Sequence, residues 1–368
     1  MAISISAPII EEEEIQAVTR VLRSGMLAAG RKTQELERLF ADFCETKYAV
    51  AVSSGTAALH ASVHALGISH GDEVITSPFS FAASANAILM EGANVVFADI
   101  REDDFCIDPQ KIEAKITNKT KAILPVDLFG QLVDTECIRN IARGHTLRTI
   151  EDACQSVGAE RNGIKAGSVG DVGCFSFYAT KNVISGEGGM ITTNDADIAE
   201  RCRRFRHHGQ SEHTRYEYWE LGYNYRTTDI CAAIALEQLK KIERFTTARI
   251  ENAKHLTEGL RDIPGIILPT IHQNSTHVFH QYTIRVTEEC KRTRDELVNH
   301  LRAHNIGVGI YYPKPLHLHP HFARQGYEKG DFPVAEKLAT EVLSLPVHPS
   351  LTDQDIEVVL NTTREYAQ

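Results

Sequence analysis

The sequence predicts an α/β fold in which helices cover both faces of a mainly parallel, doubly wound sheet. Short apolar runs alternate with helical stretches along the first part of the chain, and strands separated by helices indicate βαβ units. The length of 368 residues allows one large domain with a smaller companion. The expected strands are 48–52, 73–76, 94–99, 121–126 and 147–151, and the expected helices are 11–22, 32–43, 81–89, 108–115 and 134–143.

The chain changes character after about residue 245. Before that point we expect two further strands at 172–177 and 190–193, and a helix at 228–241 that leaves the sheet. After it, a long helix precedes a strand at 280–286, a helix at 293–304 and a strand at 308–312, which indicates a smaller α+β unit closing over the large one. The predicted organisation is an N-terminal segment (1–20), a large domain (21–240) and a small C-terminal domain (241–368).

Composition and charge exclude several classes of protein. Charged residues at 24% and hydrophobic residues at 42% are typical of a globular protein. The net charge of −10 and pI near 5.9 argue against binding to nucleic acid or to membranes, which would favour a basic surface. The N-terminus lacks the basic region of a secretory signal, and no apolar run reaches the ~18 residues of a membrane span. Because the eight cysteines form no CxxC pair, we expect reduced thiols and a cytoplasmic location.

A run of histidines near the C-terminus is the one candidate for a metal site. His317, His319 and His321 alternate along the run, but no cysteine or carboxylate lies at ligand spacing beside them. The sequence therefore predicts no metal site.

Polar and aromatic residues follow three of the expected strands. Ligands of doubly wound sheets bind beyond the carboxyl ends of the strands, so Ser54-Gly55-Thr56, Phe79-Ser80-Phe81 and Asp152 should converge on one crevice. The first of these segments also opens a helix, which favours an anion site, although a plain serine N-cap explains the same residues equally well. Asp152 could cap the next segment, or pair with a cation or a ring nitrogen. Phe81 could belong to the ordinary core.

Lys181 follows the strand at 172–177 and precedes a glycine-rich turn at 186–189. A loop lysine is usually solvated, but a rigid, partly desolvated one can form a Schiff base with a carbonyl compound. Gly186, Gly188 and Gly189 favour a turn with positive φ or a close approach of the backbone to a ligand. The cluster precedes a strand rather than a helix, so it is no dinucleotide-binding motif.

An acid, a lysine, an aromatic residue and a helix N-terminus at one crevice match the requirements of pyridoxal phosphate. The chain resembles the fold-type I sugar aminotransferases of the DegT/DnrJ/EryC1/StrS family from about Gly25 onward. This resemblance implies a seven-stranded type of sheet in the large domain. The motifs behind it are SSGTAAL at 53–59, EDxxQ at 151–155, FSFxxTK at 175–181, GEGG at 186–189, GYNYR at 222–226 and YPxPLH at 312–317.

The resemblance assigns roles to four residues around the cofactor ring. It implies that Lys181 forms the Schiff base with the cofactor and later moves a proton. Asp152 is implied to keep the pyridine nitrogen protonated. Phe81 would stack on the ring, and Gln155 would contact the side of its 3-oxygen.

The resemblance also implies a phosphate site shared between two subunits. Backbone N–H groups of Gly55 and Thr56, the Ser176 hydroxyl and Asn224 of a second subunit would hold the phosphate, which implies a homodimer. The chain departs from the family at Asp127, since relatives often have Pro-Val-His where this chain has Pro-Val-Asp. The resemblance therefore assigns no role to Asp127.

The implied reaction moves an amino group from L-glutamate, through pyridoxamine phosphate, to a keto-sugar on a nucleotide diphosphate. The loop with Tyr312 and His317 resembles that of members that aminate carbon 3, so these residues would bind the hexose, although a merely rigid connector explains its prolines too. The alternatives are a 4-keto sugar, a keto-cyclitol substrate, sugar dehydration and a non-enzymatic regulatory protein. Dehydrating relatives replace the lysine by histidine, which argues against the third.

Overall fold

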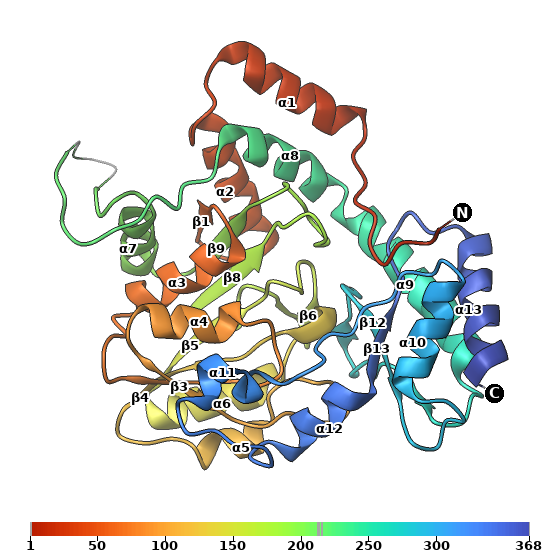
Figure 1. The fold of residues 1–368 in the computed structure, drawn as a ribbon. Helices are drawn as coiled ribbons and strands as arrows, with labels where there is room; N and C mark the ends of the chain where they lie inside the picture. The colour runs from red at the N-terminus through yellow and green to blue at the C-terminus, as the bar shows by residue number, and fades with distance from the viewer. Residues whose placement is uncertain (1, 212–213, 215, 368) are drawn as a thin grey trace.

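The computed structural model describes residues 2–211, 214 and 216–367, and its centre is a seven-stranded sheet (Figure 1). Six strands run in one direction and β9 alone is antiparallel to its neighbours, as far as the described chain shows. The sheet is therefore mainly parallel, as the sequence predicts. In spatial order the strands are β1 (Tyr48–Val52), β9 (Gly189–Thr193), β8 (Val172–Ser176), β5 (Arg148–Asp152), β4 (Thr120–Leu124), β2 (Glu73–Thr76) and β3 (Asn94–Phe97).

Helices bury both faces of this sheet. Val50 and Val52 of β1 belong to a core that includes α3 and α4, whereas Ala49 and Ala51 pack in a second core with Phe40. Successive strand residues point to opposite faces, so β1 has buried side chains on both sides and is an apolar run rather than an alternating one. The helices of this region are α1 (Glu12–Ser24), α2 (Arg31–Phe43), α3 (Gly55–Ala65), α4 (Ala83–Met90), α5 (Pro109–Glu113), α6 (Thr135–His145), α7 (Ala196–Arg206) and α8 (Asp229–Lys240).

A three-stranded antiparallel sheet has its own apolar core beside the large sheet (Figure 1). Its strands are β10 (Ile266–Ile267), β12 (Tyr282–Val286) and β13 (Val342–Leu345), and its helices are α9 (Ile242–Leu260), α10 (Arg294–Ala303) and α13 (Asp353–Ala367). Ile3, near the N-terminus, packs in this core. Leu316, Phe322 and Leu338 return to the core of the large sheet. The domain boundaries at 20/21 and 240/241 stay predictions.

Short elements connect these parts. They are η1 (Leu128–Gly130), η2 (Leu316–Leu318), α11 (Pro320–Ala323), α12 (Pro333–Glu341) and a small sheet of β11 (Ser275–Thr276), β6 (Glu160–Arg161) and β7 (Ile164–Lys165). None of the helices described is both long enough and apolar enough to cross a membrane.

The expected strand at 308–312 is wrong. Only Gly309 pairs, through an isolated antiparallel bridge to Ser344, while neighbouring Ile306 bridges to Ile3. Pro313 has no N–H to extend a ladder, so the chain leaves the sheet edge. The sequence also did not reveal β13, which pairs with β12, follows α12 directly and therefore has no turn residues to mark its start.

Candidate active site

The first turn of α3 presents unpaired backbone donors. Ser54 caps the helix, because its Oγ accepts the N–H of Ala57 at 3.1 Å, so the N-cap interpretation holds. The N–H groups of Gly55 and Thr56 have no hydrogen-bond partner among the described residues. A helix N-terminus with free N–H groups favours an anion, so the cap and an anion site coexist.

Two glycines allow this helix to approach the sheet closely. A Cβ on Gly55 would lie 2.8 Å from Cβ of Ser176 and 2.9 Å from Sγ of Cys154. A Cβ on Gly189 would lie 2.4 Å from the carbonyl oxygen of Ser54. Both positions therefore require glycine. The close approach brings Ser176, at the end of β8, against Gly55 at the start of α3. A serine hydroxyl together with free backbone N–H groups suits a phosphate group.

The loop that contains Lys181 is held by its own backbone. Phe177 donates its N–H to the Gly188 carbonyl at 2.8 Å and accepts the N–H of Ser185 at 2.8 Å. Gly186 has a φ of +84°, a left-handed conformation that favours glycine and closes the turn. The lysine is thus displayed on a fixed loop rather than on a solvated one.

The side chain of Lys181 is half-buried, and its amine makes no hydrogen bond or ion pair with the described residues. Burial lowers the pKa of this amine below its usual range, while Cys154 and Asp152 partly oppose the shift. A desolvated lysine amine without a partner loses its proton more easily. The neutral amine is the form that attacks a carbonyl.

Asp152 ends β5 and is held from helix α4. Its Oδ2 accepts the hydroxyl of Ser84 at 2.6 Å, and its Oδ1 accepts the N–H of Cys154 at 3.2 Å. The Ser80 hydroxyl lies 2.9 Å from that of Ser84, which extends the chain of hydrogen bonds. Phe81 belongs to the same turn, and 63% of its surface is exposed, unlike the fully buried Phe79.

Phe81 therefore offers an exposed aromatic ring in the segment whose Ser84 holds Asp152. These contacts bring the segment after β2 to the end of β5, whereas the cofactor-binding role of Phe81 stays a prediction. Ser84 was not singled out by the sequence. It lies in the first turn of α4, and its hydroxyl also contacts the carbonyl oxygen of Phe81, which precedes the helix, at 3.3 Å.

Gln155 and Tyr312 meet beside this cluster. Gln155 accepts the N–H of Phe129 at 2.9 Å, and its Nε2 lies 3.4 Å from the Tyr312 hydroxyl. Burial raises the pKa of Tyr312, although the hydrogen bond from Gln155 opposes the shift and Asp152 adds to it. The Tyr312 ring also packs on Phe79, with centroids 6.0 Å apart. The loop that contains Tyr312, which leaves the edge of the sheet formed by β10, β12 and β13, thus reaches the crevice of the large sheet.

His317 lies apart from this pair. Its side chain is fully buried, its Nε2 lies 3.0 Å from Oε1 of Glu336, and its ring packs on Phe332. It offers no exposed atom in this conformation, so contact with a sugar requires this loop to move. Its predicted binding role stays a prediction.

His280 is a buried residue near the site that the sequence did not reveal. Its Nδ1 has no hydrogen-bond partner among the described residues. Burial lowers its pKa well below the usual range, and the charges of Lys181 and Arg249 add to the effect. Nothing in the apolar run around it marks this position.

Asn224 lies in the segment between α7 and α8, where it pairs with the residue after α7. It is exposed and bridges to His207, and the neighbouring Tyr225 carbonyl accepts the N–H of Ser53 at 2.8 Å. Exposed aromatic side chains surround this segment, namely Tyr216, Tyr218, Trp219 and Tyr223. The exposed position leaves Asn224 accessible to a second chain.

Among the described residues, one group of three potential metal ligands lies together, formed by Glu11, Glu13 and Glu14. The Lys241 amine lies within 3.2 Å of a carboxylate oxygen of each, so a protein cation already neutralises the group. The histidine run at 317–321 forms no such group in this part of the chain.

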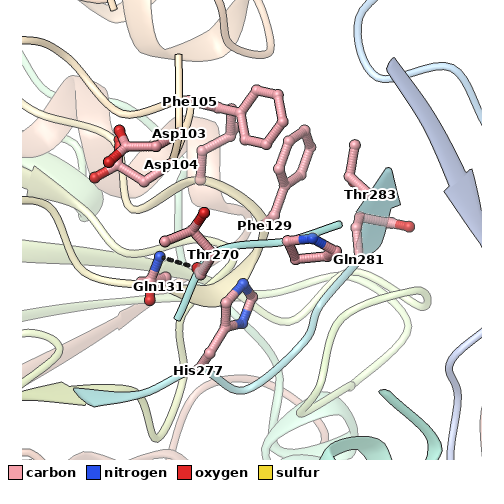
Figure 2. A pocket seen from close by; sticks show the side chains of 11 residues that line it. Asp103, Asp104, Phe105, Phe129, Gln131, Thr270, His277, Gln281 and Thr283 are labelled. Atoms are coloured by element: carbon pink, nitrogen blue, oxygen red, sulfur yellow. Dashed lines mark hydrogen bonds between the residues drawn. The ribbon is translucent and has the colours of Figure 1, made fainter. Parts of the chain in front are cut away.

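A separate small pocket lies between the two sheets, where Phe129 lines one wall (Figure 2). Gln131 donates to the Thr270 carbonyl at 3.0 Å across its base. The pocket meets the crevice through Phe129, whose backbone N–H binds Gln155. Its other labelled residues are Asp103, Asp104, Phe105, His277, Gln281 and Thr283.

Comparison with known proteins identifies close relatives along nearly the whole chain. The spore coat polysaccharide biosynthesis protein SpsC of Bacillus subtilis is 42% identical, over 98% of this chain and 96% of its own length. GDP-perosamine synthase of Caulobacter vibrioides is 39% identical (97% and 96%). The dTDP-3-amino-3,4,6-trideoxy-alpha-D-glucose transaminase of Streptomyces venezuelae is 37% identical (98% and 93%).

Solved structures agree with these relatives. DesV of S. venezuelae, in complex with a ketimine intermediate, superposes with a TM-score of 0.93 at 37% identity, covering 97% of this chain and 95% of its own. The PLP-form of the putative sugar aminotransferase Spr1654 of Streptococcus pneumoniae gives 0.95 at 28% identity, covering 100% and 99%.

The model of the DegT/DnrJ/EryC1/StrS aminotransferase family matches residues 8–364. This match and the structural neighbours confirm the predicted fold class, the aminotransferase activity and the pyridoxal phosphate cofactor. The chain belongs to the DegT/DnrJ/EryC1/StrS aminotransferase family.

Proposed function

We propose that this enzyme transfers an amino group from L-glutamate to the keto carbon of a hexose carried on a nucleotide diphosphate. The observation that supports the assignment most strongly is the unpaired, desolvated amine of Lys181 beside Asp152 and Cys154. Two of the relatives named above have a nucleotide-linked sugar in their names, and the third is named for the biosynthesis of a polysaccharide. A cytoplasmic location belongs to the same proposal, because nucleotide sugars are made there.

The residues present fit pyridoxal phosphate. The N–H groups of Gly55 and Thr56 and the Ser176 hydroxyl would bind its phosphate, since the two glycines leave room that a Cβ would fill. Phe81 would cover one face of the ring, and Gln155 would donate from the amide group that now faces Tyr312.

When bound, the cofactor supplies the carbonyl that receives the amino group and a ring that withdraws electrons. Lys181 then moves a proton, for which a lowered pKa suits its amine because the neutral form must accept it. Asp152 holds a proton at the ring nitrogen, and the Ser84 hydroxyl fixes the carboxylate that does so. Exclusion of water by the Tyr312 loop would strengthen both effects.

The active site is shared between two subunits in this proposal. Asn224 is exposed in one chain and would bind the phosphate held by a partner, so the enzyme acts as a homodimer. Hybrid dimers test this point. Mixing Lys181→Ala with Asn224→Ala protein should restore activity, because one site of each hybrid is intact, and inactive hybrids with confirmed subunit exchange would contradict the shared site.

Carbon 3 of the hexose is the proposed acceptor. The YPxPLH loop resembles that of carbon-3 enzymes, and one relative is named a 3-amino sugar transaminase at 37% identity. Tyr312 lies beside Gln155 in the crevice, where its hydroxyl can orient a hexose.

A panel of nucleotide keto-sugars with L-glutamate tests the function, with NMR locating the new amine. Competition between 3-keto and 4-keto sugars at equal concentration decides the carbon. Preference for the 4-keto compound would contradict carbon 3 and favour the alternative. Amination of a keto-cyclitol but of no nucleotide sugar would contradict the proposal.

A further inference from the structure

Two carboxyl groups lie in contact directly behind Asp152. Glu151 precedes it in β5, and Asp127 follows β4 in the adjacent position of the sheet. Both side chains have 0% of their surface exposed. Val126 bridges to Asp152, so Asp127 and Glu151, one residue further on and one residue back, point to the same face of the sheet, and each carboxyl influences the pKa of the other. Successive strand residues alternate in direction, so Glu151 faces away from the side on which Asp152 meets Ser84.

Each oxygen of Glu151 accepts one backbone N–H and keeps a further lone pair. Its Oε1 accepts the N–H of Gly167 at 2.8 Å, and its Oε2 accepts the N–H of Val169 at 3.0 Å. These two donors fix the carboxyl in one orientation. A change of this side chain to an amide would leave one N–H facing an NH₂ group.

Asp127 is held in the same way from the other side. Its Oδ1 accepts the N–H of Val133 at 3.1 Å, and its Oδ2 accepts the hydroxyl of Ser156 at 3.0 Å. Its own backbone N–H donates to the Asp152 carbonyl at 3.1 Å, and the Asp152 N–H donates to the Pro125 carbonyl at 2.9 Å. The segment that displays Asp152 is thus joined to the segment that contains Asp127.

The charged groups around the pair give no compensation for two negative charges. Burial raises the pKa of both carboxyls, and the charge of Asp152 adds to the effect on Asp127. The thiols that interact with the pair are Cys44, Cys106 and Cys174, whose pKa values burial raises well above the usual range. Lys165 acts on Cys44 and Arg161 acts on Cys106, but neither cation is among the main influences on the pKa of Asp127 or of Glu151. Two ionised, buried carboxylates in contact would therefore be very unfavourable.

We propose that Asp127 and Glu151 share one proton and, as a pair with a single negative charge, position Asp152. The four N–H and O–H donors stabilise that one charge, and the shared proton joins the ends of β4 and β5. The pair is a positioning group and touches neither substrate nor cofactor. The inference rests on the proposed function only where it makes Asp152 the partner of the cofactor ring.

The test is the pH dependence of unfolding of the cofactor-free protein, followed in urea for wild type and Asp127→Asn. A shared proton that the unfolded chain releases makes the folded form less stable as pH rises above the ordinary carboxyl pKa, until the raised pKa is reached. The amide introduced by Asp127→Asn can donate an N–H to Glu151, so the variant needs no proton. The wild-type unfolding constant should rise relative to the variant by about tenfold per pH unit from about pH 5.

Parallel pH curves for the two proteins would overturn the proposal. Infrared spectroscopy gives a second measurement that needs no variant to fold: wild-type protein at neutral pH should show the carbonyl stretch of a protonated carboxylic acid, and its absence would also overturn the proposal. Glu151→Gln should lose the pH effect but unfold more easily at every pH, since one backbone N–H loses its acceptor. Neither the unfolding nor the infrared experiment depends on aminotransferase activity, so failure of the proposed function would leave both results unchanged.

Discussion

Replacing Ser84 by alanine should slow the enzyme without much effect on its fold. The Ser84 hydroxyl donates to Asp152 Oδ2 at 2.6 Å, a short bond to a carboxylate. A hydrogen bond to a charged group contributes about 1.5–3 kcal/mol. If the bond supports the charge that Asp152 provides during the reaction, kcat/KM should fall by roughly 10- to 150-fold. The assay is kcat/KM of the cofactor-loaded enzyme with L-glutamate and a nucleotide keto-sugar.

Ser80→Ala is the matched control. The Ser80 hydroxyl lies 2.9 Å from that of Ser84 and makes no bond to Asp152. The substitution therefore removes one neutral hydrogen bond from the same turn. Its effect should be about 1 kcal/mol, or roughly fivefold. Equal losses of kcat/KM in the two variants would refute the reasoning. They would show that the conformation of the turn matters and that the bond to Asp152 does not.

Three further changes test other parts of the site. Asp152→Asn should lower the rate by roughly 100-fold or more while the cofactor remains bound, measured by absorbance and kcat; near wild-type turnover would exclude the role. Gly55→Ala should weaken cofactor binding by roughly 10- to 100-fold, because its Cβ would lie 2.8 Å from Ser176 Cβ. Gly144→Ala, where a Cβ meets nothing within 4 Å, is the control and should bind normally. Lys181→Ala should abolish turnover but still bind pyridoxamine phosphate in an equilibrium titration.

The sequence predicts most of the large sheet because its strands are short apolar runs between helices. Tyr48–Val52 and Glu73–Thr76 match the expected bounds, and the other large-sheet strands differ by one or two residues at an end. Burial on both faces is what makes these runs continuous in hydrophobicity. The family and the cofactor follow from motifs whose order along the chain is specific.

The sheet formed by β10, β12 and β13 was harder to predict for a physical reason. Val342–Leu345 follows α12 without a turn, so its apolar residues resemble a continued helix, whereas the expected strand at 308–312 is stopped by Pro313. Contacts between distant segments were equally hidden. Gln155 meets Tyr312 and Phe129, and Asp127 meets Glu151, only because the fold brings these residues together.

The same limit applies to the site. Three residues at or after strand ends could be predicted from the sequence, because parallel strands end at the same edge of the sheet. They are Gly55, Phe81 and Asp152. Ser84 and His280 could not be predicted, because the residues that act on them lie far along the chain. Ser84 bonds to Asp152, and the charges of Lys181 and Arg249 act on His280. His317 shows the opposite case, in which a prominent motif residue is fully buried against Glu336.

The most direct test of the account is to locate the lysine that binds the cofactor. Treating the holoenzyme with borohydride, followed by proteolysis and mass spectrometry of the peptides, attaches the cofactor to the lysine that held it. The account predicts a label on Lys181, whose side chain is half-buried and whose amine has no hydrogen-bond or ion-pair partner among the described residues. A label on any other lysine, or none in a protein that has bound the cofactor, would contradict it.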